Sequence, residues 1–267
     1  MTSLQSRLLV SVIGVPLLLW VVLAAPPWVL AAMLALLSGI AAWELIRCVG
    51  MPLKGLLPWL TVAAAAAVPL CAFGAEKWVQ PVAAAYCLAA FAIAVLKGGG
   101  VRFAHLMAGI FSVVMIPYAF TAFLRIHMED HRAYLLLPFI FSFLSDTFAY
   151  FIGRAIGRHK LAPKVSPNKT VEGAIGGLVG NAVGGVAFAF VMGTWFGEPI
   201  DYLGIVALGV LCSVIAQLGD LSFSMIKREF GIKDYGHLFL AHGGVLDRFD
   251  SVLFVAPVLA LLLPLMN

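Results

Sequence analysis

Two polar segments in the second half of the 267-residue chain contain residue types that bind metal ions and phosphate. The second of them, Ser224 to Asp250, holds four cations, four acids, two histidines and a Gly-Gly pair within 27 positions. Hard cations take oxygen ligands, and polyphosphates take cationic side chains. We therefore predict a site for Mg²⁺ and phosphates in this segment.

The Gly243-Gly244 pair and two acids give this segment its finer pattern. Glycine permits tight backbone geometry and a close approach of amides to a ligand. Asp247 and Asp250 are three positions apart, so they share a face if the last helix has begun. Zinc is disfavoured, because the two histidines lack a neighbouring cysteine or a third histidine. The sequence contains no P-loop, GxSxG or HExxH motif.

The first polar segment, Arg154 to Gly173, carries only cations until Glu172. Its end reads as a helix start, with Thr170 as a cap and Glu172 near the first turn. A helix N-terminus beside Lys169 is a ready site for an anion. The alternative is ordinary positive-inside topology with attraction to anionic lipids, worth about 1 kcal/mol per cation.

Asp146 lies within the apolar run FSFLSDTFAYFIGR. A carboxylate at such depth costs several kcal/mol unless it faces a polar cavity or a partner. Helical spacing places it on one face with Ser142, Tyr150 and Arg154. We predict that this face lines a cavity; the alternative is a structural Asp–Arg pair between helices.

Asp220 lies near the end of another apolar run, AQLGDLSFSMIKRE. Ser224 and Lys227 follow on the same face and form a polar stripe that descends toward the cytoplasm. The alternative is a capped helix end with snorkelling cations. That alternative accounts for the cations but poorly for an intramembrane carboxylate.

The composition of the chain indicates the kind of structure that positions these polar residues. The chain is 63% hydrophobic and only 11% charged, with a mean hydropathy of +1.04, whereas soluble domains are about a quarter charged. Repeated apolar runs of about 18 or more residues favour a bilayer. We predict an all-α polytopic integral membrane protein with about nine transmembrane helices. They cover residues 8–25, 28–46, 56–74, 78–96, 104–125, 134–153, 171–195, 202–226 and 250–266.

The cations predict the orientation. With the N-terminus in the cytoplasm, 14 of the 17 Lys and Arg residues lie at cytoplasmic ends. The outer side then holds only Lys77, Arg125 and Arg132. Residues 1–130 form an N-terminal region of about five spans with little polar detail. Residues 131–267 form a C-terminal catalytic region, whose cytoplasmic loops are 154–170 and 227–249.

Other features of the sequence have structural interpretations. The glycines spaced along span 171–195 predict close helix packing. The four cysteines form no CxxC motif, and we interpret them as small core residues. A net charge of +4 without a basic, aromatic-interleaved soluble patch does not indicate nucleic acid binding.

At these polar residues the chain resembles the phosphatidate cytidylyltransferase (CDP-diacylglycerol synthase) family. The family's C-terminal pattern is Ser, Lys-Arg and Lys-Asp, then a Pro-Gly-His-Gly-Gly turn before Asp-Arg-x-Asp. Residues in register with it are Ser224, Lys227, Arg228, Lys233, Asp234, His242, Gly243, Gly244, Asp247, Arg248 and Asp250. The upstream family pattern matches Asp146, Gly153-Arg154, Lys160 through Gly173, and Gly219-Asp220. The resemblance is close over residues from about 134 to 257.

The resemblance implies that CTP and phosphatidic acid react to CDP-diacylglycerol and pyrophosphate. It implies Mg²⁺ held by Asp220 and Asp247, with Asp146 and Asp250 in support, and it is compatible with a second monovalent or divalent cation. Catalytic roles are expected for Asp220, Lys227, Arg228, Asp247, Arg248 and Asp250. Substrate contacts are expected for Asp146, Lys164, Ser166, Lys169, Thr170, Glu172, Lys233, Asp234, His242, Gly243 and Gly244. Which loop holds the lipid phosphate stays open.

The expected partners are CTP, phosphatidic acid and membrane lipids, with no nucleic acid; a homodimer is compatible with the sequence. The expected location is the inner (plasma) membrane, with several spans and the active site facing the cytoplasm. One departure from the family is Leu240-Ala241 in place of Pro-Gly, which removes a rigid turn and a permissive φ. Two alternatives remain: a CTP-dependent enzyme on another lipid phosphate or polyprenol, and a non-catalytic lipid-binding paralogue.

Overall fold

The computed structural model describes residues 3–98, 100–128, 132–197, 201–238 and 243–266. The Leu240-Ala241 turn and His242, singled out in the sequence, lie outside the described residues. The chain divides into two compact units. The first comprises Met1–Arg132 and Glu229–Phe249, and the second comprises Ala133–Arg228 and Asp250–Asn267. The polar segment before Asp250 therefore belongs with the N-terminal helices.

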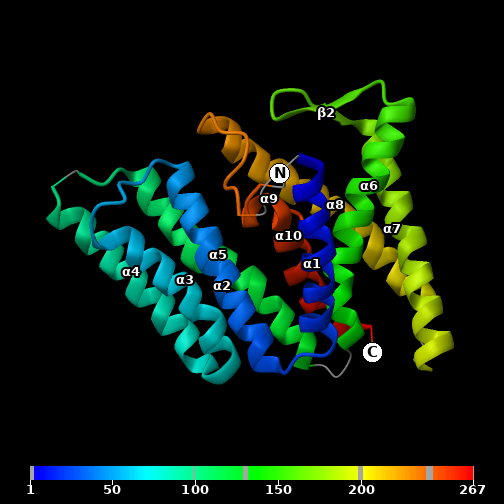
Figure 1. Ribbon diagram of the computed structural model, residues 1–267, viewed down its shortest axis with the longest axis horizontal. Coiled ribbons are helices and arrows are strands. Elements are labelled where there is room, and N and C mark those ends of the chain that lie inside the picture. Colours follow the sequence, from blue (N-terminus) through cyan, green and yellow to red (C-terminus); the bar gives the residue numbers. More distant parts are fainter. Residues whose placement is uncertain (1–2, 99, 129–131, 198–200, 239–242, 267) are drawn as a thin grey trace. The chain divides into compact units, whose positions relative to one another are not determined.

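The first unit is built from long helices (Figure 1). Its elements are α1 (Ser3–Leu23), α2 (Pro27–Cys48), α3 (Leu56–Gly74), η1 (Glu76–Trp78), α4 (Val79–Leu96), α5 (Phe103–Met128) and the short α9 (Val245–Phe249). Helix α2 begins at a proline, which is tolerated there because the first helical amide has no partner within the helix. Helices α2, α3 and α5 pack against one another and form the core.

The second unit contains helices and one small hairpin. The 3-10 segment η2 (Arg132–Leu136) precedes α6 (Leu137–Ile156), and β1 (Lys160–Ala162) and β2 (Ser166–Thr170) follow. The remaining elements are α7 (Val171–Val191), the π-helical η3 (Met192–Phe196), α8 (Tyr202–Glu229), α10 (Val252–Leu262) and η5 (Leu263–Leu265). Strands β1 and β2 pair antiparallel, in a segment that the sequence analysis treated as an irregular loop.

The all-α polytopic architecture is confirmed. Within the described residues, seven helices are long and apolar enough to cross a membrane, and their bounds lie within a few residues of the predicted spans. The first and last predicted spans correspond to shorter apolar segments in that part of the chain, Gly14–Leu23 and Val252–Leu265. The last apolar helix starts after Asp250 because α9 and a turn come first.

The core of the first unit contains a buried polar pair among apolar side chains. The Thr61 hydroxyl donates to the Leu57 carbonyl at 2.8 Å, and it lies 2.8 Å from the Tyr86 hydroxyl. Gly109 leaves room for that hydroxyl, which a side chain at this position would displace. These bonds satisfy polar atoms that neither water nor lipid can reach.

The glycines of α7 pack directly against α6, as their spacing predicted. A Cβ at Gly173 would lie 2.5 Å from the Ala149 carbonyl oxygen, and one at Gly176 would collide with Ile152. Gly177 is likewise within 3.0 Å of Ser145 when a Cβ is added. Small residues let the two backbones approach closely, which is how helices associate in a bilayer.

Thr170 caps α7, as predicted, and ends the hairpin. Its side-chain oxygen accepts a hydrogen bond from the Gly173 amide at 3.1 Å, and its backbone is extended (φ −125°, ψ 155°). The same oxygen would lie 2.8 Å from a Cβ at Gly153 of α6. The cap therefore sits where β2, α6 and α7 meet.

We expect Gly173→Ala to destabilise the protein, because the added methyl would meet the Ala149 carbonyl and the Gly153 Cα, neither of which moves without a backbone shift. Overpacking of this kind costs about 1–3 kcal/mol. The thermal midpoint in detergent should therefore fall. The matched control is Gly74→Ala, where no atom lies within 4 Å of the added carbon. Equal midpoints for the two variants would contradict the packing described here.

Candidate active site

A groove of about 480 Å³ opens at the polar end of the second unit. It is lined by residues from α6, the hairpin, α7 and α8, among them Asp146, Asp220 and Lys169. The volume lies in the range of small-molecule sites. The predicted cavity that contains both intramembrane carboxylates is therefore present within this unit.

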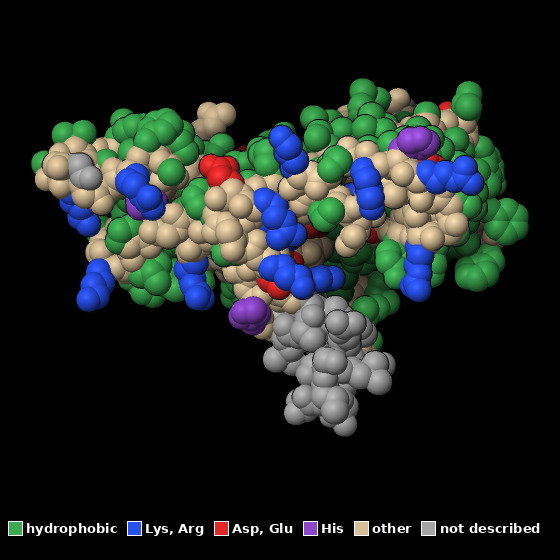
Figure 2. Space-filling model, turned by 90° about the horizontal axis from the view of Figure 1, so that it is seen from above, with side chains coloured by type: hydrophobic (Ala, Val, Ile, Leu, Met, Phe, Trp, Pro, Cys, Tyr) green, Lys and Arg blue, Asp and Glu red, His purple; other side chains and the backbone are tan. Residues whose placement is uncertain are grey.

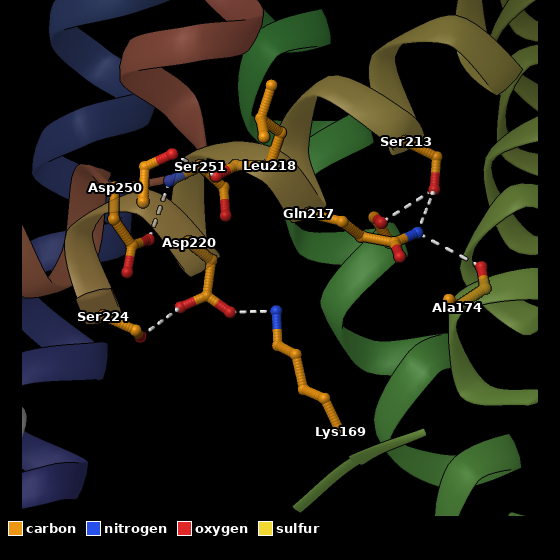
Figure 3. Close-up of polar contacts among 11 residues, drawn as sticks. Lys169, Ala174, Ser213, Gln217, Leu218, Asp220, Ser224, Asp250 and Ser251 are labelled. Atoms are coloured by element: carbon orange, nitrogen blue, oxygen red, sulfur yellow. Dashed lines mark hydrogen bonds and ion pairs between the residues drawn. The ribbon is translucent and has the colours of Figure 1, made fainter. Parts of the chain in front are cut away.

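Asp220 is held by groups from two elements (Figure 3). Its Oδ2 forms an ion pair with the Lys169 ammonium, which extends from β2. Its Oδ1 accepts a longer hydrogen bond, 3.4 Å, from the Ser224 hydroxyl one turn along α8. Both side chains of the ion pair are about four-fifths buried, with 23% and 22% exposed. The pair thus links the hairpin to α8.

Asp250 brings a third carboxyl group into electrostatic reach of Asp220 and Asp146. It lies in the turn before α10, and its Oδ1 accepts from the Ser251 amide at 2.7 Å. Burial raises the pKa of Asp250 above its ordinary value, and the carboxylates of Asp220 and Asp146 raise it further, while Lys227 opposes the shift. Gly219 lets α8 lie close to the turn at Asp250, because a Cβ there would lie 2.7 Å from the Asp250 carbonyl oxygen.

A polar network that the sequence analysis did not identify fixes the walls of the groove. The Gln217 amide nitrogen donates to the Ala174 carbonyl at 3.1 Å and to the Ser213 hydroxyl at 3.2 Å. Ser213 in turn lies 2.8 Å from the Ser145 hydroxyl. The network ties α6, α7 and α8 together. Gln217 lies one turn before Asp220 and within the same apolar run, a signal that was available in the sequence.

Predicted cations from both polar segments lie at the same end of the second unit as the groove. Arg154 donates to the Tyr150 hydroxyl at 3.1 Å. Both line the groove with Asp146, as predicted for their helix face, whereas Ser142 is buried and is not part of the lining. Arg228 Nε donates to the Val165 carbonyl at 3.4 Å and joins α8 to the hairpin turn. Lys164 is exposed in that turn. Figure 2 shows one face of the molecule, on which Lys and Arg side chains stand out from neutral and hydrophobic surroundings.

Glu172 has a structural task in the first turn of α7. Its carboxylate accepts from the Arg158 amide at 3.0 Å, from the His159 amide at 3.2 Å, and lies 2.6 Å from His159 Nδ1. These bonds hold the start of the hairpin against α7. Its predicted contact with substrate stays a prediction, as does that of Ser166, which begins β2.

In the first unit, Asp247 joins two described parts of the polar stretch Glu229–Phe249. Asp247 Oδ2 accepts from the Tyr235 amide at 2.7 Å and from the Gly244 amide at 3.0 Å. Gly243 adopts φ +84°, a left-handed conformation that favours glycine. Asp247 therefore organises the loop, in addition to the metal ligation predicted for it. The other predicted side chains described here, Lys233, Asp234 and Arg248, are exposed.

Glu44 of α2 contacts this loop, and the sequence analysis missed it. Its side chain is buried, with 4% exposed. It accepts hydrogen bonds from the backbone amides of Val245 and Leu246, both at 2.9 Å. The signal was a carboxylate inside the apolar run 28–46, the criterion that singled out Asp146.

The donor set fits a hard divalent cation in part. Carboxylate oxygens suit Mg²⁺, which is usually bound through one or two carboxylates with phosphate and water completing its shell. Within the described part of the chain, no group of three or more His, Cys, Asp and Glu side chains is arranged to hold a metal ion. Lys169 already places a positive charge beside Asp220. Asp220 and Asp247 belong to different units, so their joint metal site stays a prediction.

Fold and site together define a polytopic α-helical membrane protein with a carboxylate-lined polar groove at the ends of its helices. The model of the Cytidylyltransferase family matches residues 5–266. The chain belongs to this family.

Three relatives are phosphatidate cytidylyltransferases. The chain is 38% identical to the protein of Bacillus subtilis (strain 168) over 162 residues, which cover 58% of this chain and 57% of the relative. It is 34% identical to a Staphylococcus epidermidis protein over 211 residues, which cover 78% and 79%. It is 38% identical to the Staphylococcus saprophyticus protein over 164 residues, which cover 61% of each. The match thus spans more than half, but not all, of each relative's length.

We expect Mg²⁺ to raise the thermal midpoint of the wild-type protein in detergent, and we expect Asp220→Asn to weaken this effect. The reason is that a ligand that binds only the folded state stabilises it, and asparagine lacks the charge that attracts the cation. Asp201→Asn is the matched control. It changes an acid at the other end of the same helix, where the side chain accepts from the amides of Leu203 and Gly204 and asparagine caps as well. A Mg²⁺ response that Asp220→Asn leaves intact would contradict a metal at this carboxylate.

Proposed function

We propose that this protein transfers the cytidylyl group from CTP to phosphatidic acid and produces CDP-diacylglycerol and pyrophosphate. The observation that carries the proposal is the carboxylate-lined groove, in which Lys169 pairs with Asp220 between membrane helices. One substrate is a lipid and the other a soluble polyanion, so the reaction needs a polar site at the edge of the bilayer. The names of the relatives support the same substrates.

The reaction joins a phosphatidate oxygen to the α-phosphorus of CTP and breaks the bond between the α-phosphorus and the bridging oxygen. Pyrophosphate leaves with that oxygen. A phosphatidate oxygen is already ionised at neutral pH, so the chain need not supply a general base. Catalysis then consists mainly of positioning and neutralising charge.

The chain's own groups divide this work. Lys227, Arg228, Lys233 and Arg248 neutralise the triphosphate, and Asp220 and Asp247 hold the divalent cation with Asp146 and Asp250 in support. When bound, Mg²⁺ neutralises phosphate oxygens and orients the leaving group. The Lys169 ammonium pairs with Asp220 in the structure described here. When nucleotide enters, a phosphate group replaces Asp220 as the partner of Lys169. Lys164, Ser166 and Thr170 contact phosphate of the lipid or the nucleotide.

The proposed site faces the cytoplasm of a bacterial inner membrane, where CTP is available. The positive-inside rule supports this orientation. In the first unit, Lys97 and Arg102 lie at one helix end, near Gly55 and Gly50 respectively. In the second unit, Lys169 and Arg228 lie at the end where the hairpin meets α8. Cations at these helix ends are what the positive-inside rule expects of cytoplasmic ends.

We expect purified protein to form labelled CDP-lipid from labelled CTP, phosphatidic acid and Mg²⁺, and we expect Asp247→Asn to reduce the turnover number by about 100-fold or more. Loss of one group that stabilises transition-state charge has effects of this size. Asparagine keeps an oxygen that can accept from the Tyr235 and Gly244 amides, so the loop should persist. The measurement is the initial rate at saturating substrates, with Asp201→Asn as the control.

Different outcomes separate the alternatives. Wild-type protein that binds phosphatidic acid normally but makes no CDP-lipid would refute the enzymatic proposal and favour a lipid-binding paralogue. Faster reaction with another lipid phosphate or a polyprenol, in a panel at equal concentration, would keep the CTP chemistry and replace the acceptor.

A further inference from the structure

Glu44 is a buried acid that the proposed mechanism does not use. It lies near the C-terminal end of α2, whose other side chains are apolar or small except for Arg47 in the last turn. Its Oε1 accepts from the Val245 amide and its Oε2 from the Leu246 amide, both at 2.9 Å. These two amides are the first of α9, so the carboxylate caps a helix that lies about 200 residues away in the sequence.

The loop around α9 is shaped to fit this carboxylate. A Cβ at Gly244 would lie 2.6 Å from Glu44 Oε2, and a Cβ at Gly236 would lie 3.0 Å from its Cδ. Gly243 instead needs glycine for its φ of +84°. The two positions therefore require glycine for different reasons. Gly243 adopts a backbone conformation that turns the chain, and Gly244 leaves room for the Glu44 carboxylate.

The cap matters because α9 is only five residues long. A helix this short has little stability of its own, and its first amides have no partner within it. Hydrogen bonds to a charged acceptor are stronger than those between neutral groups, and leaving a buried carboxylate without its donors is costlier still. The orientation of α9 therefore depends on Glu44.

Two of the predicted catalytic residues are on α9, directly after the capped amides. Asp247 follows Leu246, and Arg248 follows Asp247. Asp247 also accepts from the Gly244 amide, next to the amides that Glu44 holds. A rotation of α9 would thus displace both side chains and loosen the loop that Asp247 closes.

We propose that Glu44 is a positioning residue of the active site: its carboxylate fixes the N-terminus of α9 and thereby sets the places of Asp247 and Arg248. The catalytic part of this inference rests on the proposed cytidylyl transfer, whereas the structural part, an N-terminus of α9 held by Glu44, does not. The N-terminal helices then contribute to catalysis through one side chain, although they supply none of the predicted phosphate or metal ligands.

The test compares Glu44→Gln with the wild type. Glutamine has the same shape but only one acceptor oxygen, and its NH₂ group faces one of the two backbone amides. The matched control is Ser38→Ala, which changes a buried polar group on the same helix whose hydroxyl has no hydrogen-bond partner among the residues that the structure describes. Each protein is reconstituted in the same lipid and measured for CDP-lipid formation, thermal midpoint and hydrogen exchange of a peptide that covers Val245 and Leu246.

For Glu44→Gln we expect the turnover number to fall about tenfold or more, since a misplacement of about 1 Å can cost 100-fold. The Michaelis constants for CTP and phosphatidic acid should change less. Exchange at Val245 and Leu246 should become faster, while the rest of α2 keeps its protection. The double variant Glu44→Gln/Asp247→Asn should be slower than Asp247→Asn by less than the factor that Glu44→Gln costs on its own, because residues that act as a unit are not additive. Ser38→Ala should leave all three readouts near wild type.

Three results would overturn the inference. Unchanged turnover in Glu44→Gln would remove the catalytic role, and unchanged exchange at the two amides would remove the cap. If Glu44→Gln does not fold, Gly244→Ala tests the same contact, and failure of both variants to fold would make Glu44 a residue of fold stability alone. Wild-type protein without cytidylyl transfer would refute the proposed function, while the exchange measurement would still decide whether Glu44 holds α9.

Discussion

A carboxylate among apolar helices must find donors or cations, because lipid and protein interior offer it no water. In this protein two such groups obtain partners from a distant part of the chain. Glu44 takes two backbone amides of α9, and Asp220 takes the ammonium of Lys169 from the hairpin. Because each of these two carboxylates needs a partner, each holds a polar loop against a membrane helix. The loops that carry the predicted chemistry are held in place by these contacts.

The same requirement explains how the chain divides. The polar segment Glu229–Phe249 belongs with the N-terminal helices, although it follows α8 in sequence. Its contact with α2 includes the buried Glu44, and the ring of Phe249 lies 5.5 Å from that of Phe120 in α5. This segment is thus held by an acceptor from α2 and an aromatic ring from α5. The N-terminal helices therefore do more than span the bilayer.

The groove in the second unit depends on close packing as much as on charge. Glycines of α7 allow α6 to approach, and the cap at Thr170 ends the hairpin where β2, α6 and α7 meet. The short hairpin directs Lys169 back toward α8, where Asp220 lies one turn beyond Gln217. Small residues thus set the distances, and the few polar side chains then meet at hydrogen-bonding range.

Much of this was predictable from the sequence because the underlying signals are local. Hydropathy gave the long helices, since a bilayer demands apolar runs of fixed length. Glycine spacing predicted close packing of α7 against another helix, though not which one, and a Thr followed by an acid predicted the start of α7. The pattern of acids and cations around Asp220 and Asp247 indicated phosphate chemistry, and the family match agrees with it. Each of these inferences needs only neighbours within a few turns.

Other features depended on contacts between residues far apart in the sequence. The hairpin Lys160–Thr170 was not predicted, because its strands are short and it is held in place by side chains outside it, those of Glu172 and Arg228. Glu44 is recognisable in the sequence as a carboxylate inside an apolar run, but its partners are not, because they are backbone amides, which leave no trace in residue type. The sequence by itself determined the class of protein, the long helices and the chemistry of the polar residues. Only the tertiary structure decided which helix holds which loop, since that depends on where a buried carboxylate finds its donors.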